Sequence, residues 1–460
     1  MDSRLRRALV GLAASTAAPL DVLVRLVPLP EAAERMAWRQ RALPDMLAEK
    51  LLATGNPTIA LALDVAGRCS PAFRERIAEH PNGDIRDARR KFVEHTILVG
   101  NRVQTDELEQ YAGPDGLAGL AGNPDPWLRE AVARTWESMP AAVRRALLTD
   151  PDPGVRQAAA GYPHPPAPED LHASLLRDDA TRTAAAAYAL LTPQSALDLV
   201  AGDEELRIEV ALNPSLPPEL RDRLADDPSP VVRALLVLRQ DLPEDRRQRL
   251  YQGLVVESAG EFNDAYWGLV LADGAWMDRA MLGWLCSLPL HERLTYLDSS
   301  IPCFRRAVAT GGDLPPDVVA RLDSDADVMV RRIVARRGDV PPAVLERLVV
   351  DHGENPKFRP YLVEHPNFPR DGFVRLATNP ESARRVLALH GEDLPVSIVA
   401  ALACDDDASV RQAAAGHLRI PAVQLEALLD DDNLDVVEAA GIAPALPVNA
   451  MVRLLQEARL

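Results

Sequence analysis

Apolar side chains recur along this chain with the spacing of short helices. In the stretch DDPSPVVRALLVLRQDL, four apolar residues fall on one helical face: Val231, Val232, Leu235 and Leu236. Asp227 or Ser229 is suited to cap such a helix, and Pro230 fits its first position. The pattern therefore predicts a short helix that begins near residue 230.

A second kind of helix is predicted wherever prolines open an apolar stripe. In LPPELRDRLAD, Pro217 and Pro218 preset the first turn, and Leu220 and Leu224 share one face. The alternation of apolar and polar residues that is typical of strands does not occur in the sequence. We therefore predict an all-α fold of short helix pairs separated by proline turns.

These helix pairs belong to an internal repeat. The heptapeptide VRQAAAG occurs at Val155–Gly161 and again at Val410–Gly416, and the two copies lie 255 residues apart. Between them, a pattern of D-x-x-V-R-x-A, a break and L-P-P-x-x-L-x-x-L returns about every 26 residues. A period of this kind is typical of a solenoid, in which stacked repeats form one continuous core.

The stacking also predicts how the chain is organised. One pair of short helices cannot bury its apolar face alone, so neighbours supply the core and the end repeats are atypical. Repeats before about Ala66 and after about Ala443 are therefore candidates for caps. The predicted segments are degenerate capping repeats (1–65), a helical array (66–250), degenerate aromatic-rich repeats (251–304), and a second array with a C-terminal cap (305–460).

The arginine of the repeat forms a row along the chain, here called the arginine row. Its members are Arg86, Arg129, Arg156, Arg182, Arg207, Arg233, Arg305, Arg331, Arg359, Arg384 and Arg411. One interpretation is a cationic stripe that binds an anionic partner. The other is local pairing, because nine of these eleven arginines have a helix-capping residue four positions earlier, the exceptions being Ile301 and Pro380. We favour local pairing, in which the arginine row neutralises its own charge.

The repeats resemble those of the leucine-rich repeat variant family. The resemblance is carried by LLTDPDPGVRQAAAGYPHPP (Leu147–Pro166) and VALNPSLPPELRDRLADDPSPVVRALL (Val210–Leu236), and it extends over most of the chain. It implies an α-helix and a short 3₁₀-type helix per repeat, stacked into a right-handed superhelix similar to that of HEAT repeats. It also implies a binding role without catalytic residues. One branch of the family carries an N-terminal cysteine cluster for an iron–sulfur centre, but this chain has only Cys69 among its first 285 residues.

Composition and charge restrict the classes of partner and cofactor that the chain is expected to bind. The formal net charge of −17 argues against general binding of nucleic acid or of anionic membranes, which requires clustered Lys and Arg. The four cysteines are far apart, as expected for reduced residues of a cytoplasmic protein. We expect no cofactor.

Candidate metal and catalytic motifs are incomplete. Asp323, Asp325 and Asp327 imitate the start of a calcium loop, but Val328 and Val334 stand where such a loop needs Gly and Glu. Helix capping is the favoured role of these carboxylates. Neither G-x-S-x-G nor H-E-x-x-H occurs, and the nine histidines lack zinc spacing, so we expect neither a metal nor a catalytic site.

The composition changes where the arginine row is interrupted. Between Arg233 and Arg305 lie eight of the twenty aromatic residues. One interpretation is degenerate repeats with a bulkier core. The other is a partner-binding patch, because Trp and Tyr anchor interfaces. The candidate partner-binding residues are Tyr266, Trp267, Trp276, Trp284 and Tyr296.

We therefore expect a non-enzymatic scaffold that binds an unidentified protein or peptide and has no membrane partner. Extended solenoid surfaces typically serve this role. The alternative is an enzyme of the helical-repeat DNA glycosylase kind, because acidic residues lie among the tryptophans of the aromatic-rich segment. A basic concave face that presents Trp beside a carboxylate would favour that alternative.

Overall fold

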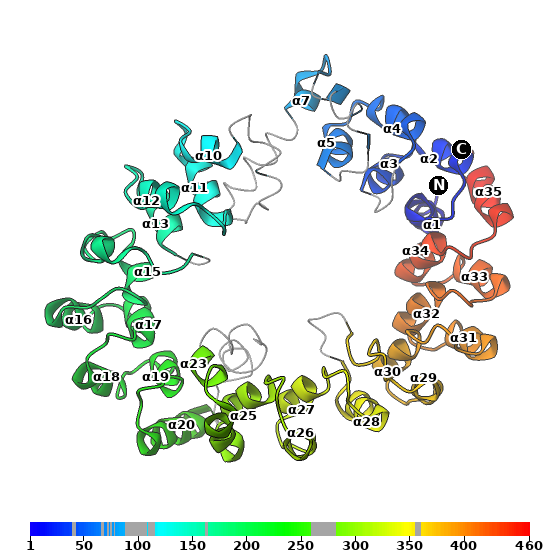
Figure 1. Cartoon of the computed structure of the whole chain (residues 1–460). Coiled ribbons are helices and arrows are strands. Elements are labelled where there is room, and N and C mark those ends of the chain that lie inside the picture. Colours follow the sequence, from blue (N-terminus) through cyan, green and yellow to red (C-terminus); the bar gives the residue numbers. More distant parts are fainter. Residues whose placement is uncertain are drawn as a thin grey trace. The chain divides into compact units, whose positions relative to one another are not determined.

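The computed structural model describes most of the chain as short helices joined by tight turns (Figure 1). The described residues are 1–38, 43–65, 69–70, 73, 76–77, 79–87, 108, 116–161, 164–258, 282–354 and 360–460. Every regular element within these ranges is an α-helix or a 3₁₀ helix, as predicted. The chain folds into two compact units, 1–92 with 335–460 (unit 1) and 93–334 (unit 2).

The helix bounds of each unit are as follows. Unit 2 contains α10 (Gly116–Ala121), α11 (Pro126–Thr135), α12 (Ala141–Leu148), α13 (Pro153–Ala160), η1 (Glu169–Leu171), α14 (His172–Leu175), α15 (Arg182–Ala186), α16 (Pro193–Val200), α17 (Glu204–Leu212), α18 (Pro218–Leu224), α19 (Pro230–Val237), α20 (Glu244–Ser258), α23 (Gly283–Cys286), α24 (Leu290–Arg293), η3 (Leu294–Asp298), α25 (Pro302–Ala309), α26 (Pro316–Asp323) and α27 (Val328–Val334). Unit 1 contains α1 (Ser3–Ala14), α2 (Leu20–Leu26), α3 (Pro30–Ala37), α4 (Asp45–Leu52), α5 (Pro57–Val65), α7 (Gly83–Arg86), α28 (Pro342–His352), α29 (Arg370–Leu376), α30 (Ser382–Ala388), α31 (Val396–Leu402), α32 (Ala408–Ala415), α33 (Ala422–Leu428), α34 (Leu434–Ile442) and α35 (Val448–Glu457).

The predicted helices around residues 216–242 are confirmed. Helix α18 begins at Pro218 behind Pro217, and α19 begins at Pro230 behind Ser229. The Ser229 hydroxyl donates to Glu204, while the Ser229 backbone N–H donates to the Asp227 carboxylate at 2.8 Å. Ser229 therefore stands at the N-cap position without a side-chain capping bond, and Asp227 orders the turn before it.

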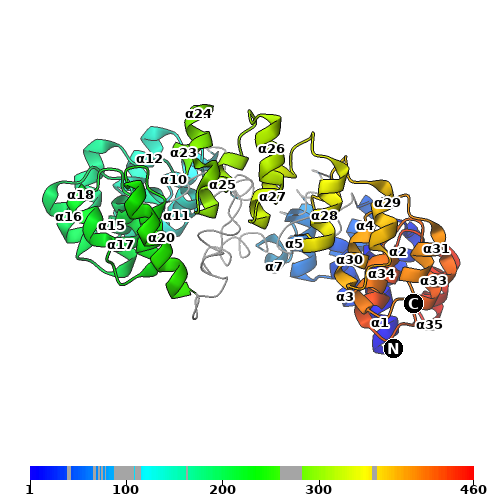
Figure 2. The same ribbon diagram turned by 90° about the horizontal axis from the view of Figure 1, so that it is seen from below.

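The helices of unit 2 stack in rows of every second element. Helices α11, α13, α15, α17 and α19 contact one another in succession, and α16 packs on α18 in the adjoining row (Figures 1 and 2). Alanine, valine and leucine side chains such as Val155, Ala159 and Val210 fill the space between the helices and are fully buried. Aromatic residues make up only 4% of the chain, which agrees with a core of small aliphatic side chains.

In unit 1 the stacking continues from the C-terminal repeats into the N-terminal ones. One row runs through α30, α32 and α34 and then through α1, α3 and α5, while α35 contacts α2 and α2 contacts α4 (Figure 1). One apolar core extends through both sets of helices. The first repeat therefore packs on the last as if it were the next in sequence.

Two glycines allow the helix backbones to approach closely at this junction between the chain ends. A Cβ atom at Gly11 would collide with the Glu438 backbone carbonyl, and a Cβ atom at Gly441 would collide with the Ala8 carbonyl. Arg7 forms ion pairs with Asp435 and Glu438, both at 3.0 Å, beside this contact. The four-segment organisation with capping ends stays a prediction, and at this junction the two predicted caps pack on each other.

Candidate functional site

Several members of the arginine row bind a carboxylate of the next repeat. Arg129 donates from Nε and Nη2 to the two oxygens of Asp150, both at 2.8 Å. Its Nη1 donates to the backbone carbonyls of Asn123 and Pro124, at 2.8 and 3.0 Å. The guanidinium therefore ties together two turns of successive repeats.

The same bidentate arrangement recurs along both units. It joins Arg156 to Asp178, Arg207 to Asp227, Arg305 to Asp325, Arg385 to Asp405 and Arg411 to Asp431. In most of these pairs the aspartate stands two residues before a helix N-cap and accepts a hydrogen bond from the N-cap backbone N–H, as Asp150 does from Asp152 at 2.9 Å. Most of the positive charge of the arginine row is therefore neutralised within the array.

The prediction that each arginine pairs with the residue four positions earlier is wrong. That residue caps its own helix, as Asp152 does by accepting from the Gly154 and Val155 backbone N–H groups. Its carboxylate therefore points along the helix axis, whereas the arginine extends across the gap to the next repeat. The capping role itself is confirmed here and at Asp407, which accepts from the Ser409 backbone N–H.

One further member of the arginine row differs from the prediction. Arg385, not Arg384, occupies the position of the arginine row, because Arg385 binds Asp405 while Arg384 reaches back to the Val350 carbonyl. Arg359 lies outside the described residues. Of the residues that imitate a calcium loop, Asp325 and Asp327 instead bind Arg305 and Arg306.

Several of these pairs lower the pKa of their carboxyl groups, as at Asp150 and Asp178. Hydrogen bonds from Arg129 hold the pKa of Asp150 below its ordinary value, and the Arg156 guanidinium does the same for the pKa of Asp178. Only 12% of the Arg129 side chain and 8% of the Asp150 side chain are exposed. Both partners are therefore shielded and stay ionised together.

The inter-repeat pairing lapses at Arg182. The position two residues before the next N-cap, Asp203, is occupied by the exposed Ala201, so no aspartate of that repeat faces Arg182. The Arg182 Nε atom donates to the Leu176 carbonyl at 3.1 Å, and Nη2 pairs with Asp179 at 3.0 Å. Because 92% of the Asp179 side chain is exposed, that ion pair is worth little.

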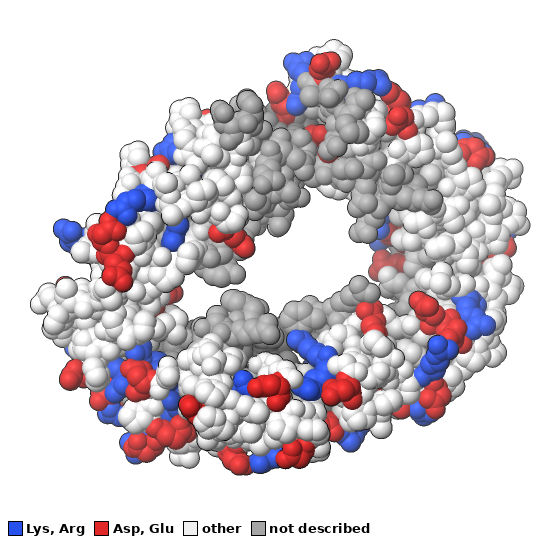
Figure 3. All heavy atoms as spheres, viewed as in Figure 1, with Lys and Arg blue, Asp and Glu red and all other residues white. Residues whose placement is uncertain are grey.

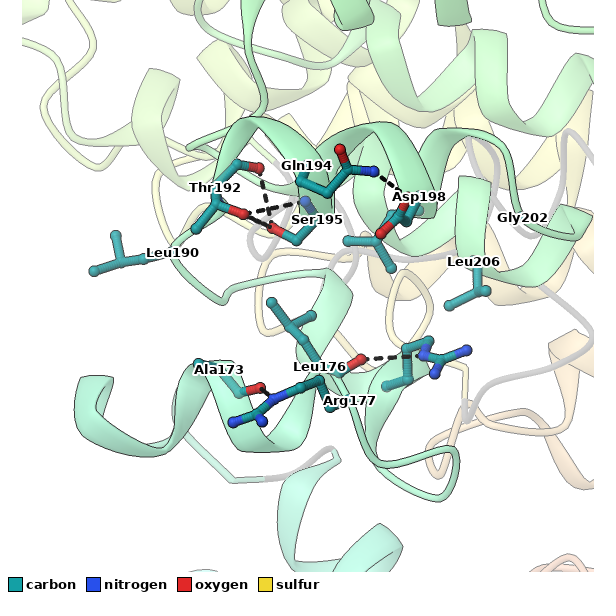
Figure 4. A pocket seen from close by; sticks show the side chains of 12 residues that line it. Ala173, Leu176, Arg177, Leu190, Thr192, Gln194, Ser195, Asp198, Gly202 and Leu206 are labelled. Atoms are coloured by element: carbon teal, nitrogen blue, oxygen red, sulfur yellow. Dashed lines mark hydrogen bonds between the residues drawn. The ribbon is translucent and has the colours of Figure 1, made fainter.

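A pocket of about 590 Å³ opens beside Arg182, between the repeat of α14 and α15 and the repeat of α16 and α17 (Figure 4). On one side of the pocket the three residues of η1 run directly into the four of α14, and on the other side α16 has eight residues.

Apolar and cationic groups line this pocket together. Figure 4 shows Leu176 and Arg177 on one wall and Gln194, Ser195 and Asp198 on the wall opposite. Leucines supply most of its apolar surface: Leu176, Leu190, Leu199 and Leu206. Leu190 is 56% exposed, so its apolar side chain is accessible from solvent.

The polar groups of the pocket differ in how many of their hydrogen bonds and ion pairs are made within the chain. Thr192 and Ser195 satisfy each other in a capping box, and Gln194 donates to Asp198 at 2.8 Å. Arg177 donates from Nε to the Ala173 carbonyl at 2.8 Å, and no described acidic side chain pairs with it. The two arginines are therefore the groups most available to a ligand.

The aromatic-rich segment is only partly described. Tyr266, Trp267 and Trp276 lie outside the described residues. Trp284 and Tyr296 are half-buried with their ring centroids 5.8 Å apart, and the Trp284 indole N–H donates to the Leu238 carbonyl at 2.9 Å. These two rings thus contribute to the core around α25, and the partner-binding patch stays a prediction.

Charge on the visible face is mixed. Figure 3 shows acidic and basic residues interspersed among uncharged ones, with no continuous basic area among the described residues of this face. No helix within the described ranges combines the length and apolar character that are needed to cross a membrane.

The stacked helix pairs define the class as a helical repeat protein. Residues 204–229, which contain α17 and α18, match the family model of the leucine rich repeat variant. The predicted resemblance is therefore confirmed at this repeat, which adjoins the pocket. Comparison with curated proteins gave no match.

Proposed function

We propose that this chain is a non-enzymatic scaffold that binds a segment of another protein. The observation that carries the proposal is the open pocket between two repeats, where exposed Leu190 lies with Arg177 and Arg182. Pockets that combine apolar walls with a few placed polar groups are typical binding sites. Repeat families of this kind generally serve protein interaction, which supports the same conclusion.

The proposal also includes the way in which the repeats stack. Repeats of about 26 residues stack into a right-handed superhelix, whose surface presents one or more such pockets to a partner. The partner is a protein or peptide, and the site of action is the cytoplasm. The net charge of −17 and the paired arginine row support a partner other than nucleic acid.

The alternative of a DNA glycosylase-like enzyme gains no support from the described surface. An enzyme of that kind needs unpaired cations that track the phosphate backbone, whereas most of the described arginine row is paired in bidentate fashion with aspartates. Trp284 is engaged with the Leu238 carbonyl and with neighbouring rings.

Site-specific photo-crosslinking tests the proposal. A photoreactive phenylalanine analogue replaces exposed Gln194 in the pocket or, as a matched control, exposed Gln456 in unit 1. We expect one defined partner from the native host to cross-link at 194 and not at 456, and to form a stoichiometric complex when purified. Equal or absent cross-linking at both positions contradicts the proposed site.

A further inference from the structure

We propose that the pocket beside Arg182 binds an acidic side chain of a partner peptide, which takes the place of the aspartate that the array lacks at position 201. This inference rests on the proposed function and names the chemistry of the partner. It commits to an extended peptide segment in which a carboxylate neighbours leucine-like side chains.

The first argument is what the other arginines of the row do. Arg129, Arg207 and Arg411 each meet both oxygens of an aspartate that stands two residues before a helix N-cap. Such fork-shaped pairing is the preferred geometry between a guanidinium and a carboxylate. At Arg182 the corresponding residue is Ala201, whose methyl group cannot accept a hydrogen bond.

The second argument is the space that accompanies the missing carboxylate. The pocket lies between the α14 and α16 elements, and its lining includes Leu199 and Gly202, which flank the segment of Ala201. A Cβ atom at Gly202 would come within 2.8 Å of the Leu206 side chain, so the chain there packs tightly against that leucine. The pocket, which Arg182 also lines, provides the space for an external carboxylate.

The third argument is charge. Arg177 and Arg182 line the pocket together, and Asp198, its one acidic lining residue, accepts a hydrogen bond from Gln194. The only carboxylate paired with Arg182 among the described residues is Asp179, which water already solvates. A ligand carboxylate that also buries leucines would compete well, because exclusion of water strengthens a charge-assisted pair.

The test begins with a random dodecapeptide phage library that is panned on the purified full-length chain. We expect enriched peptides to carry Asp or Glu next to Leu, Ile or Val. For a synthetic fluorescent copy of the enriched peptide, replacement of its acidic residue by the amide is expected to weaken binding at least about tenfold.

Two variants locate the contact. Arg182→Gln is expected to lose the same tenfold or more, whereas Arg223→Gln, an exposed arginine in the following repeat, is expected to change affinity less than about twofold. Ala201→Asp supplies the missing carboxylate from within the chain, and we expect this carboxylate to pair with Arg182. Peptide binding is then expected to weaken, while the chain stays folded or gains thermal stability.

Each outcome is informative. Enrichment of peptides without acidic residues, or binding that is indifferent to Arg182→Gln and Ala201→Asp, overturns the carboxylate inference. If a partner still cross-links at position 194 in that case, the scaffold function stands alone. Competition by a (dT)12 oligonucleotide that depends on Arg182 would overturn the inference in favour of a phosphate ligand.

Discussion

The pairing between repeats makes a quantitative prediction at Arg411. Its Nε and Nη2 atoms donate to the two oxygens of Asp431 at 2.8 and 2.9 Å, and its Nη1 atom donates to the Asp405 carbonyl at 2.8 Å. The sequence pattern alone would assign Asp407, four residues earlier, as the partner. A double-mutant cycle distinguishes the two partners, because only residues in contact show coupling.

Asp431→Ala removes two charge-assisted hydrogen bonds and the acceptor of the Asn433 backbone N–H. Each hydrogen bond to a charged group is worth about 1.5–3 kcal/mol, but the Arg411 guanidinium is accessible enough to be rehydrated in part. The exposed fractions of the Arg411 and Asp431 side chains are 19% and 9%. We therefore expect a loss of about 2–3 kcal/mol in the free energy of unfolding.

The assay is urea unfolding followed by far-UV circular dichroism, with hydrogen exchange of α32 and α34 to localise the effect. The control Asp432→Ala removes an exposed carboxylate one residue away and is expected to cost less than about 0.5 kcal/mol. Asp407→Ala removes a helix cap and costs about 1 kcal/mol, with coupling to Arg411→Ala near zero. A larger coupling of Arg411 to Asp407 than to Asp431 would refute the reasoning.

Three further predictions concern pH, the junction of the chain ends and the aromatic core. In the folded chain the pKa values of Asp150 and Asp405 lie below their ordinary value. The free energy of unfolding that they contribute is therefore complete above about pH 5 and falls below about pH 4, as they are protonated. A loss that begins between pH 6 and 7 would contradict this. Gly441→Ala forces a methyl group onto a backbone carbonyl and should lower the free energy of unfolding by at least about 1–3 kcal/mol in the same urea titration. In the control Gly416→Ala the Cβ atom would lie 3.5 Å from its nearest neighbour, so the loss should be less than about 1 kcal/mol. Trp284→Phe leaves the Leu238 carbonyl without its donor and should lower the free energy of unfolding by about 1–3 kcal/mol; an unchanged thermal midpoint would show that this hydrogen bond contributes nothing.

The local elements of the fold were predictable because their signals are local. Prolines and capping residues fixed the starts of α18 and α19, and the spacing of leucines and valines identified the faces that they bury. The composition likewise indicated a core of small residues. None of this required knowledge of how one repeat lies on the next.

What the sequence could not supply is the geometry between repeats. Arg156 and Asp178 are 22 residues apart, and no helical periodicity relates them. The nearer Asp152 offered a plausible partner, but its carboxylate accepts from backbone N–H groups of its own helix, whereas Arg156 donates to Asp178. For the same reason the packing of α1 on α34 could not be predicted from the sequence, since only the folded array brings residues 8 and 441 together.

The pocket shows how a regular array acquires a specific site. Arg182 keeps the arginine of the repeat, but the repeat that follows has Ala201 in place of its aspartate, and a pocket opens beside Arg182. Either change alone would be minor: an unpaired arginine in a filled repeat would be inaccessible, and a pocket beside a paired arginine would lack a charge to offer. In the proposed site, these two features together replace an internal contact by a contact to a ligand, and Ala201→Asp is the substitution expected to reverse this.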